Sequence, residues 1–286
     1  MNVGLVTPLP PAPPAPPIDP AALAQLAERL GFESFWAQEH AIAPVRVESS
    51  SRVFSDGQVP GFTDPVVVLS RCSAVTSRIL LGTATLLPAE HNPIILAKAL
   101  ATLDLLSGGR LQVGIGAGWL REEAEIMGVD FDHRWTQVRE AAQLMKALWT
   151  QDEAEFHGRY YDIPPVRCEP KPLQSPHPPI LLGGTAKNVL KRVVAWGDGW
   201  IPHWVTIPEV AEARRRLDDL ADAAGRDPRS LTISIYSDEQ DLDTVSRLHD
   251  AGADRVVVRL PEVESVDAAA DEANAIAEQL GLPSPS

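Results

Sequence analysis

The chain has 286 residues, of which 44% are hydrophobic and 22% charged, as in folded globular proteins. Its 25 basic and 39 acidic side chains give a formal net charge of −14, which argues against nucleic acid as a partner because that requires a basic surface. No apolar run approaches the roughly 18 residues that a membrane span needs, so we expect no membrane partner.

Cysteine usage and the first residues indicate the compartment. Cys72 and Cys168 lie in no CxxC motif and near no Cys/His cluster, which argues against a disulfide framework or a metal site. The opening residues, MNVGLVTPLP, lack the basic region and apolar core of a secretory signal. We therefore expect a soluble cytoplasmic protein with two reduced thiols.

Eight strands are predicted, several of them apolar almost throughout, as in a parallel sheet buried on both faces. They cover residues 3–7, 34–39, 79–87, 111–117, 179–184, 199–204, 231–237 and 255–260. Helical patterns alternate with them at 19–31, 93–106, 132–149, 186–196, 208–224, 240–251 and 264–280. The first helix has Asp19 as an N-cap and Pro20 at its first position.

This alternation predicts a single (β/α)₈ TIM barrel over residues 1–286. An open doubly wound sheet is the alternative, and it suits five or six strands better than eight. Three longer loops interrupt the pattern at 8–20, 41–64 and 150–178. Loops that follow barrel strands gather at the C-terminal face and carry function, so we expect the insertions there to set the substrate.

Three glycines in LQVGIGAGW, residues 111–119, raise the question of a dinucleotide-binding turn. The G-x-G-x-x-G fingerprint fails because the third glycine arrives one residue early and the expected acid about twenty residues on is missing. Gly114, Gly116 and Gly118 lie instead on alternate positions of a strand, where they leave one face without side chains. Such a face suits either a flat ring or close packing between barrel strands.

Several segments resemble the bacterial luciferase-like monooxygenase superfamily, and within it the branch that uses the deazaflavin coenzyme F420. The segments are GFESFWAQEH (31–40), ILLGTATLLPAEHNP (79–93), KALATLDLLSGGRLQVGIGAGWLREE (98–123), PKPLQSPHPPILLGG (170–184) and AWGDGWIP (195–202). The resemblance implies a (β/α)₈ barrel that holds a flavin or deazaflavin at its C-terminal end.

The resemblance also implies roles for residues around that ring. His40 would lie beside the reactive edge and act in proton transfer or substrate polarisation, whereas on its own it reads as a satisfied surface histidine. Ala84 and Thr85 would join through a cis peptide and support the ring, where the sequence alone suggests an ordinary bulge. Gly116, Gly118 and Trp119 would complete the ring's surroundings.

A second glycine-rich turn, Gly183, Gly184 and Thr185, precedes the predicted helix 186–196. Backbone N–H groups at a helix start suit a phosphate, and the family places the cofactor's phosphate here. Local positive charge would come from the side chains that follow, Lys187, Lys191 and Arg192. The plain alternative is a tight turn with solvated basic residues.

Other polar and aromatic residues near these motifs have weaker interpretations. Glu122 and Glu123 are expected in the first turn of a helix, where they suit its dipole. Glu39 is expected to face away from His40 and to pair with a neighbouring helix, and His91 is a second candidate for the pocket. Trp36 and Trp204 suit the cavity or the core equally.

The predicted activity is hydride transfer between F420 and a small organic substrate. Trp119 stands where sugar-phosphate dehydrogenases of the family carry a carboxylate, so that chemistry is not expected here and an apolar or aromatic substrate is favoured. The alternatives are an FMN-dependent monooxygenase of the same fold and a non-catalytic flavin- or deazaflavin-binding protein. By resemblance we also expect a homodimer.

Overall fold

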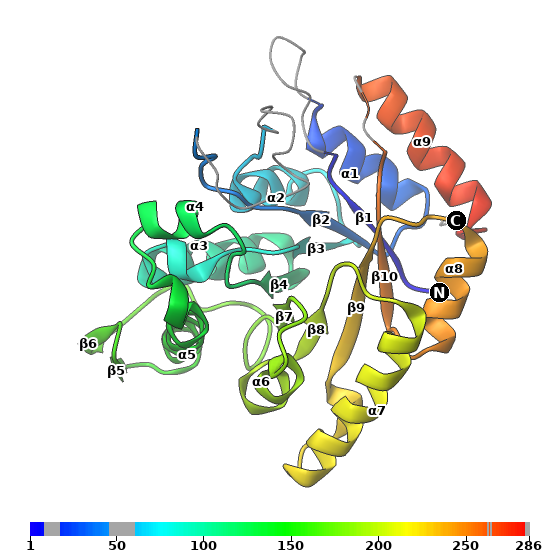
Figure 1. Ribbon diagram of the computed structural model, residues 1–286. Helices are drawn as coiled ribbons and strands as arrows, with labels where there is room; N and C mark the ends of the chain where they lie inside the picture. The colour runs from blue at the N-terminus through cyan, green and yellow to red at the C-terminus, as the bar shows by residue number, and fades with distance from the viewer. Residues whose placement is uncertain (9–17, 46–60, 262, 264, 284–286) are drawn as a thin grey trace.

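Eight parallel strands close into a barrel in a computed structural model that describes residues 1–8, 18–45, 61–261, 263 and 265–283 (Figure 1). Around the barrel the order is β1-β10-β9-β8-β7-β4-β3-β2. The strands are β1 (Val3–Val6), β2 (Ser34–Ala37), β3 (Leu80–Thr83), β4 (Leu111–Ile115), β7 (Ile180–Gly183), β8 (Gly199–Ile201), β9 (Thr232–Ser237) and β10 (Arg255–Arg259). All eight lie within the predicted ranges, so the predicted TIM barrel is confirmed.

Helices surround this barrel (Figure 1). They are α1 (Pro20–Arg29), α2 (Pro65–Ser73), α3 (Pro93–Ser107), α4 (Arg121–Ile126), α5 (Arg134–Thr150), α6 (Val189–Trp196), α7 (Ile207–Ala223), α8 (Leu242–Asp250) and α9 (Val266–Gln279). None of the described helices is long and apolar enough to cross a membrane.

One helix, α2, was absent from the prediction although its start carries a strong signal. Asp64 accepts a hydrogen bond from the Val67 N–H and Pro65 occupies the first turn, which is the arrangement that also opens α1 at Asp19. In the nine residues of α2 three consecutive valines follow Pro65, and β-branched residues disfavour a helix. The Asp64 cap and Pro65 therefore favour a helix here although the valines have a low helix propensity.

The segment between α5 and β7 forms an antiparallel hairpin that the strand prediction omitted. Its strands are β5 (Ala154–His157) and β6 (Asp162–Val166), and they project to one side of the barrel (Figure 1). Pro164 and Pro165 lie within β6, where they remove backbone donors and mask the strand signal. The hairpin is an excursion from the barrel, as the loop at 150–178 predicted.

Trp36 fills the barrel interior. It is fully buried, and its Nε1 donates a hydrogen bond to Ser34 Oγ at 2.7 Å. Gly4 and Gly82 make the space for it: a Cβ built on Gly82 would lie 2.2 Å from the indole, and one on Gly4 would lie 2.7 Å from Nε1. Trp36 is thus a core residue, and ligands have access only to the open end of the barrel.

The glycines of β4 are explained by close packing against the end of β3. A Cβ on Gly114 would lie 2.0 Å from the Thr83 carbonyl oxygen, and one on Gly116 would lie 2.5 Å from Thr85 Oγ1. Gly183 of β7 has the same neighbour, because its Cβ would lie 2.8 Å from Thr85 Cγ2. The face that the sequence leaves bare is therefore occupied by Thr85, which sits between two glycines of adjacent strands.

This packing predicts that Gly116→Ala destabilises the fold by about 2 kcal/mol, since the added methyl group overlaps a side chain in a packed interior. The overlapping atoms belong to the Thr85 side chain, so adding Thr85→Ala should recover part of the loss. Urea denaturation of the two single variants and the double variant measures this coupling. Strictly additive effects would contradict the proposed packing.

Candidate functional site

His40 follows β2 at the open end of the barrel and is held by a buried carboxylate. Its Nδ1 lies 2.6 Å from Oε2 of Glu123, which is 1% exposed and comes from α4. The other oxygen of Glu123 accepts the Ile42 N–H at 3.2 Å. Two aromatic rings flank the imidazole, Phe62 at 4.7 Å and Trp119 at 5.5 Å between centroids.

This pairing defines what the imidazole can do. A carboxylate on Nδ1 fixes the tautomer that carries its proton there. His40 is therefore oriented for exchange of a proton through Nε2. The expectation that Glu123 only complements the helix dipole was wrong: Glu123 does lie in the first turn of α4, but its carboxylate orients His40.

A second Glu–His pair lies directly beside the first. Glu39 accepts the Leu87 N–H at 2.5 Å and pairs with His91 Nε2 at 2.8 Å. The hydrogen bond from Glu39 raises the pKa of His91, against the effect of burial. Glu39 thus connects the end of β2 with the loop after β3. The expectation that it pairs with a neighbouring helix was wrong, because Leu87 and His91 flank the short 3-10 turn Pro88–Glu90 before α3.

Glu90 lies between these two pairs. It is 8% exposed, and its Oε2 has no hydrogen-bond partner among the described residues. Burial raises the pKa of Glu90 to about 8, and the nearby carboxylates of Glu123 and Glu39 add to the effect. A Cβ built on Gly118 would lie 3.3 Å from Glu90 Oε1. A protonated carboxyl therefore lies against the carboxyl end of β4 at neutral pH.

The predicted cis peptide is present between Ala84 and Thr85. Both residues are half-buried, and Ala84 packs on the inner cluster of the barrel. After this bulge the chain resumes pairing with β4, where the Leu86 N–H donates to the Gly114 carbonyl at 2.8 Å. Ala84 and Thr85 thus follow β3 at the C-terminal end of the barrel, which we call the floor, and Thr85 packs against Gly116 and Gly183 there.

The predicted phosphate turn differs in one respect from the expectation. Gly184 and Thr185 are exposed, and Gly184 has φ +81° with open space where a Cβ would lie. Helix α6, however, begins only at Val189, so the prediction of a helix from 186 was wrong. Residues 186–188 form a turn instead, closed by a hydrogen bond from the Val189 N–H to the Ala186 carbonyl.

Of the three basic residues predicted beside this turn, Arg192 has the distinctive environment. Its guanidinium lies 4.6 Å from the Trp135 ring, and its Nη1 is buried without a hydrogen-bond partner in the described part of the chain. Burial and the nearby Arg134 and Arg139 lower its pKa. Lys187 and Lys191 are exposed. The positive charge in this region is thus carried by Arg192 and its neighbouring arginines, and the Nη1 of Arg192 is a buried donor that an anion could pair with.

Two residues after β8 and one near the end of β9 form an aromatic wall. His203 stacks on Trp204 at 4.0 Å and meets Tyr236 edge-on at 4.2 Å. The Tyr236 hydroxyl accepts a hydrogen bond from Gln38, two residues before His40, at 2.8 Å. A cavity of 300 Å³ lies against this wall. Trp204 is 66% exposed and lines it, which supports the cavity interpretation for this residue.

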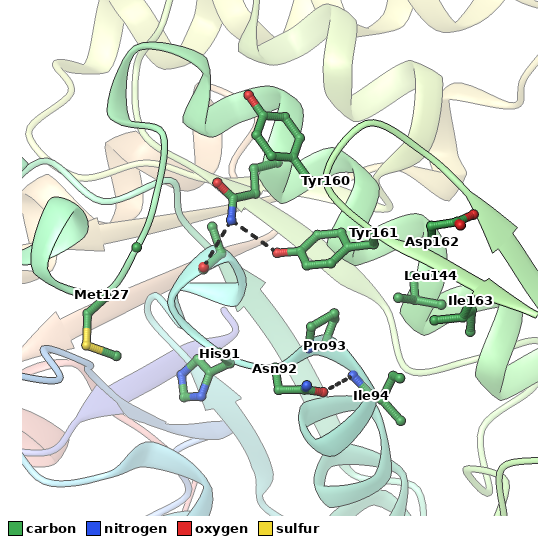
Figure 2. A pocket seen from close by; sticks show the side chains of 13 residues that line it. His91, Asn92, Pro93, Ile94, Met127, Leu144, Tyr160, Tyr161, Asp162 and Ile163 are labelled. Atoms are coloured by element: carbon green, nitrogen blue, oxygen red, sulfur yellow. Dashed lines mark hydrogen bonds between the residues drawn. The ribbon is translucent and has the colours of Figure 1, made fainter.

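A second cavity of 410 Å³ lies beside the open end rather than within it (Figure 2). His91, Asn92 and Met127 line one side, and Tyr160 of the β5–β6 hairpin contributes to the other. Gln137 bridges its rim, donating to the Ala89 carbonyl and to the Tyr161 hydroxyl at 3.4 Å each. His91 is the residue that connects this cavity with the Glu–His pairs.

The predicted site residues separate into two groups. His40 and Trp119 are in contact, and Thr85 joins Gly116 to Gly183. Gly184 and Thr185 lie beyond this cluster on the exposed turn. The sequence prediction did not identify Glu123 as the partner of His40, and it did not name Glu90. The repeated dipeptide Glu-His, at Glu39-His40 after β2 and at Glu90-His91 after β3, is the signal that could have pointed to Glu90. The described residues contain no cluster suited to a metal.

The Glu90 environment predicts a pH-dependent effect of Glu90→Gln on stability. The unfolded chain releases this proton near pH 4.5 and the folded chain only near pH 8, so wild-type stability falls as pH rises through that window. The glutamine side chain has no proton to release, so the variant lacks this loss. Its free energy of unfolding relative to that of wild type should therefore be about 2 kcal/mol higher at pH 7 than at pH 5. Urea denaturation at both pH values measures it, with Glu278→Gln on the exposed face of α9 as control. An equal effect at both pH values would contradict the prediction.

The sequence and structure were then compared with known proteins. An uncharacterized protein of Mycobacterium tuberculosis is 40% identical over 259 residues, covering 86% of this chain and 89% of its own. The FMNH(2)-dependent dimethylsulfone monooxygenase of Pseudomonas putida is 30% identical over 219 residues, covering 74% of this chain and 55% of its own.

Two solved structures share the fold at low identity. Monooxygenase RslO1 from Streptomyces bottropensis has a TM-score of 0.80 at 21% identity, covering 98% of both chains. The coenzyme F420 dependent tetrahydromethanopterin reductase from Methanopyrus kandleri has a TM-score of 0.76 at 18% identity, covering 98% of this chain and 99% of its own. The family model described as luciferase-like monooxygenase matches residues 1–240. The chain belongs to the luciferase-like monooxygenase family.

Proposed function

We propose that this protein is an F420-dependent oxidoreductase that transfers a hydride between the deazaflavin and a small organic substrate. The observation that carries the proposal is the His40–Glu123 pair, a half-buried imidazole oriented by a buried carboxylate, together with the Ala84–Thr85 cis peptide after β3. Hydride chemistry needs a surface that holds a flat ring and a group that manages a proton, and this end of the barrel offers both.

The residues present suit such a cofactor. Ala84 and Thr85 would support the ring from below, and Gly116, Gly118 and Trp119 would border it. F420 would supply the carbon that donates or accepts the hydride. Its phosphate would meet the turn that follows Gly183, at the exposed Gly184 and Thr185, and the Nη1 of Arg192. A buried guanidinium nitrogen without a hydrogen-bond partner among the described residues is costly, which supports an anion there.

His40 would polarise the substrate or move its proton, with Glu123 holding the ring in place. Trp119, 42% exposed beside it, would present an apolar wall to the substrate. The aromatic wall of His203, Trp204 and Tyr236 stands across the opening. These surfaces favour a substrate with an apolar or aromatic part.

The second candidate function is an FMN-dependent monooxygenase. It is favoured by the Pseudomonas putida relative, whose name specifies FMNH(2), and by the phosphate turn, which suits the phosphate of either cofactor. We further propose that residues 1–286 act as one domain, in a cytoplasmic homodimer that binds a small molecule. A barrel that only binds its cofactor is the remaining alternative, and turnover distinguishes it.

A fluorescence titration of the purified protein with F420 and, separately, FMN tests the proposed cofactor. We expect F420 to bind more tightly, and tight FMN binding without any response to F420 would refute the assignment.

His40→Ala should slow turnover about 100-fold while leaving cofactor affinity nearly unchanged, because the imidazole acts on the substrate. Loss of affinity with normal turnover would refute its proposed role.

Arg192→Ala tests the phosphate site with matched ligands. The variant should bind F420 about tenfold more weakly but bind its deazaflavin chromophore without the phosphate tail as wild type does, since one charge-assisted hydrogen bond is lost. FMN and riboflavin form the corresponding pair for the second candidate. Lys191→Ala, which removes an equal charge from an exposed side chain one residue away, serves as the control. Equal weakening of both ligands in a pair would place the phosphate elsewhere.

A further inference from the structure

Glu90 is a second group near the site that could transfer a proton, in addition to His40. Its Oε2 is buried and has no hydrogen-bond partner among the described residues, while its Oε1 faces the backbone at Gly118. An unpartnered polar atom at a buried position costs about 1–3 kcal/mol. Such an atom persists where a ligand or an ordered water completes it, and Gly118 borders the floor on which a ring would lie.

We propose that Glu90 is the general acid of this site and that it delivers its proton, directly or through one water, to the substrate atom that gains it during reduction. This inference rests on the proposed hydride transfer and names the source of the proton. The geometry that supports it is a carboxyl whose Oε2 is buried without a partner in the described part of the chain and whose Oε1 faces Gly118, the residue before Trp119.

Burial is the main reason why Glu90 retains a proton, and two neighbouring carboxylates add to it. Glu123 reaches it from α4 and is paired with His40, and Glu39 reaches it from the end of β2 and is paired with His91. His91 opposes proton retention but is outweighed, and Arg134 of α5 donates to the Gly118 carbonyl at 3.1 Å. Each histidine thus compensates one carboxylate, and the third carboxyl is stored as the acid, with its pKa raised to about 8.

The proposed step balances as follows for reduction of a polarised double bond. Reduced F420, when bound, would supply the hydride for the new C–H bond, and the π electrons of the double bond would move to the neighbouring atom. That atom takes the proton from Glu90, whose O–H bond breaks to leave a carboxylate, and water then restores the proton. In the oxidation direction the same carboxylate accepts the proton.

Four forms of the protein test this role: wild type, Glu90→Gln, Glu90→Asp and the exposed control Glu278→Gln. The first measurement is infrared spectroscopy of the ligand-free protein, in which a protonated carboxyl gives its own carbonyl band. We expect that band at pH 7 in wild type and in Glu278→Gln and its loss in Glu90→Gln. If wild type lacks the band, Glu90 is ionised at pH 7 and the proposal is overturned.

The second measurement is the rate at which bound reduced F420 is oxidised by 2-cyclohexen-1-one and by cyclohexanone, two probes that accept a hydride and a proton. Glu90→Gln should retain F420 affinity within about twofold and lose about 100-fold or more in rate, and Glu90→Asp should recover part of it. The wild-type rate should fall above about pH 8, and Glu90→Gln should lack this decline.

The outcomes separate this inference from the function on which it rests. If wild type fails to bind F420, the proposed cofactor is refuted. If wild type turns over and Glu90→Gln does so at the same rate, only the role of Glu90 is refuted. If wild type binds F420 but oxidises it with neither probe, the infrared band decides: a shift on F420 binding supports a carboxyl at the ligand, and an unchanged band overturns the proposal. Reduced affinity and rate in equal proportion would indicate a merely structural residue.

Discussion

The packing of Thr85 between Gly116 and Gly183 is the constraint on which the open end of the barrel depends. It brings the end of β3 inward across β4 and β7, where any larger residue at either glycine would collide with it. The chain can then resume pairing with β4 at Leu86. Through the Leu87 N–H it also provides the donor that holds Glu39, and so the position of the whole acid–base cluster follows from this contact.

The electrostatics of the site oppose those of the chain as a whole. A net charge of −14 gives no anion a general attraction, so a phosphate at the turn of Gly184, as proposed, would rely on local positive charge such as that of Arg192. At the other side of the opening, burial forces three carboxyls close together, and two histidines compensate only two of them. The structure resolves this imbalance by protonation rather than by a third cation.

The sequence was sufficient for the barrel because apolar strands and capped helices repeat along it, and all eight strands lie where that pattern predicted them. Through family resemblance it also supplied His40 and the Ala84–Thr85 cis peptide. It could not supply the partners of these residues. Glu123 lies 83 residues from His40 in the chain, and only closure of the barrel brings them together. The unpartnered state of Glu90 likewise depends on what its neighbours bind, which no local pattern records.

Trp36 closes the barrel below the floor, and this restricts the route of every ligand. With the interior filled by a fully buried indole, a molecule resting on Ala84 and Thr85 enters and leaves through the same opening as whatever lies above it. Under the proposed function, a cofactor on this floor would bind before the substrate above it and leave after it. That order of addition would follow from one side chain and from the two glycines, Gly4 and Gly82, that accommodate it.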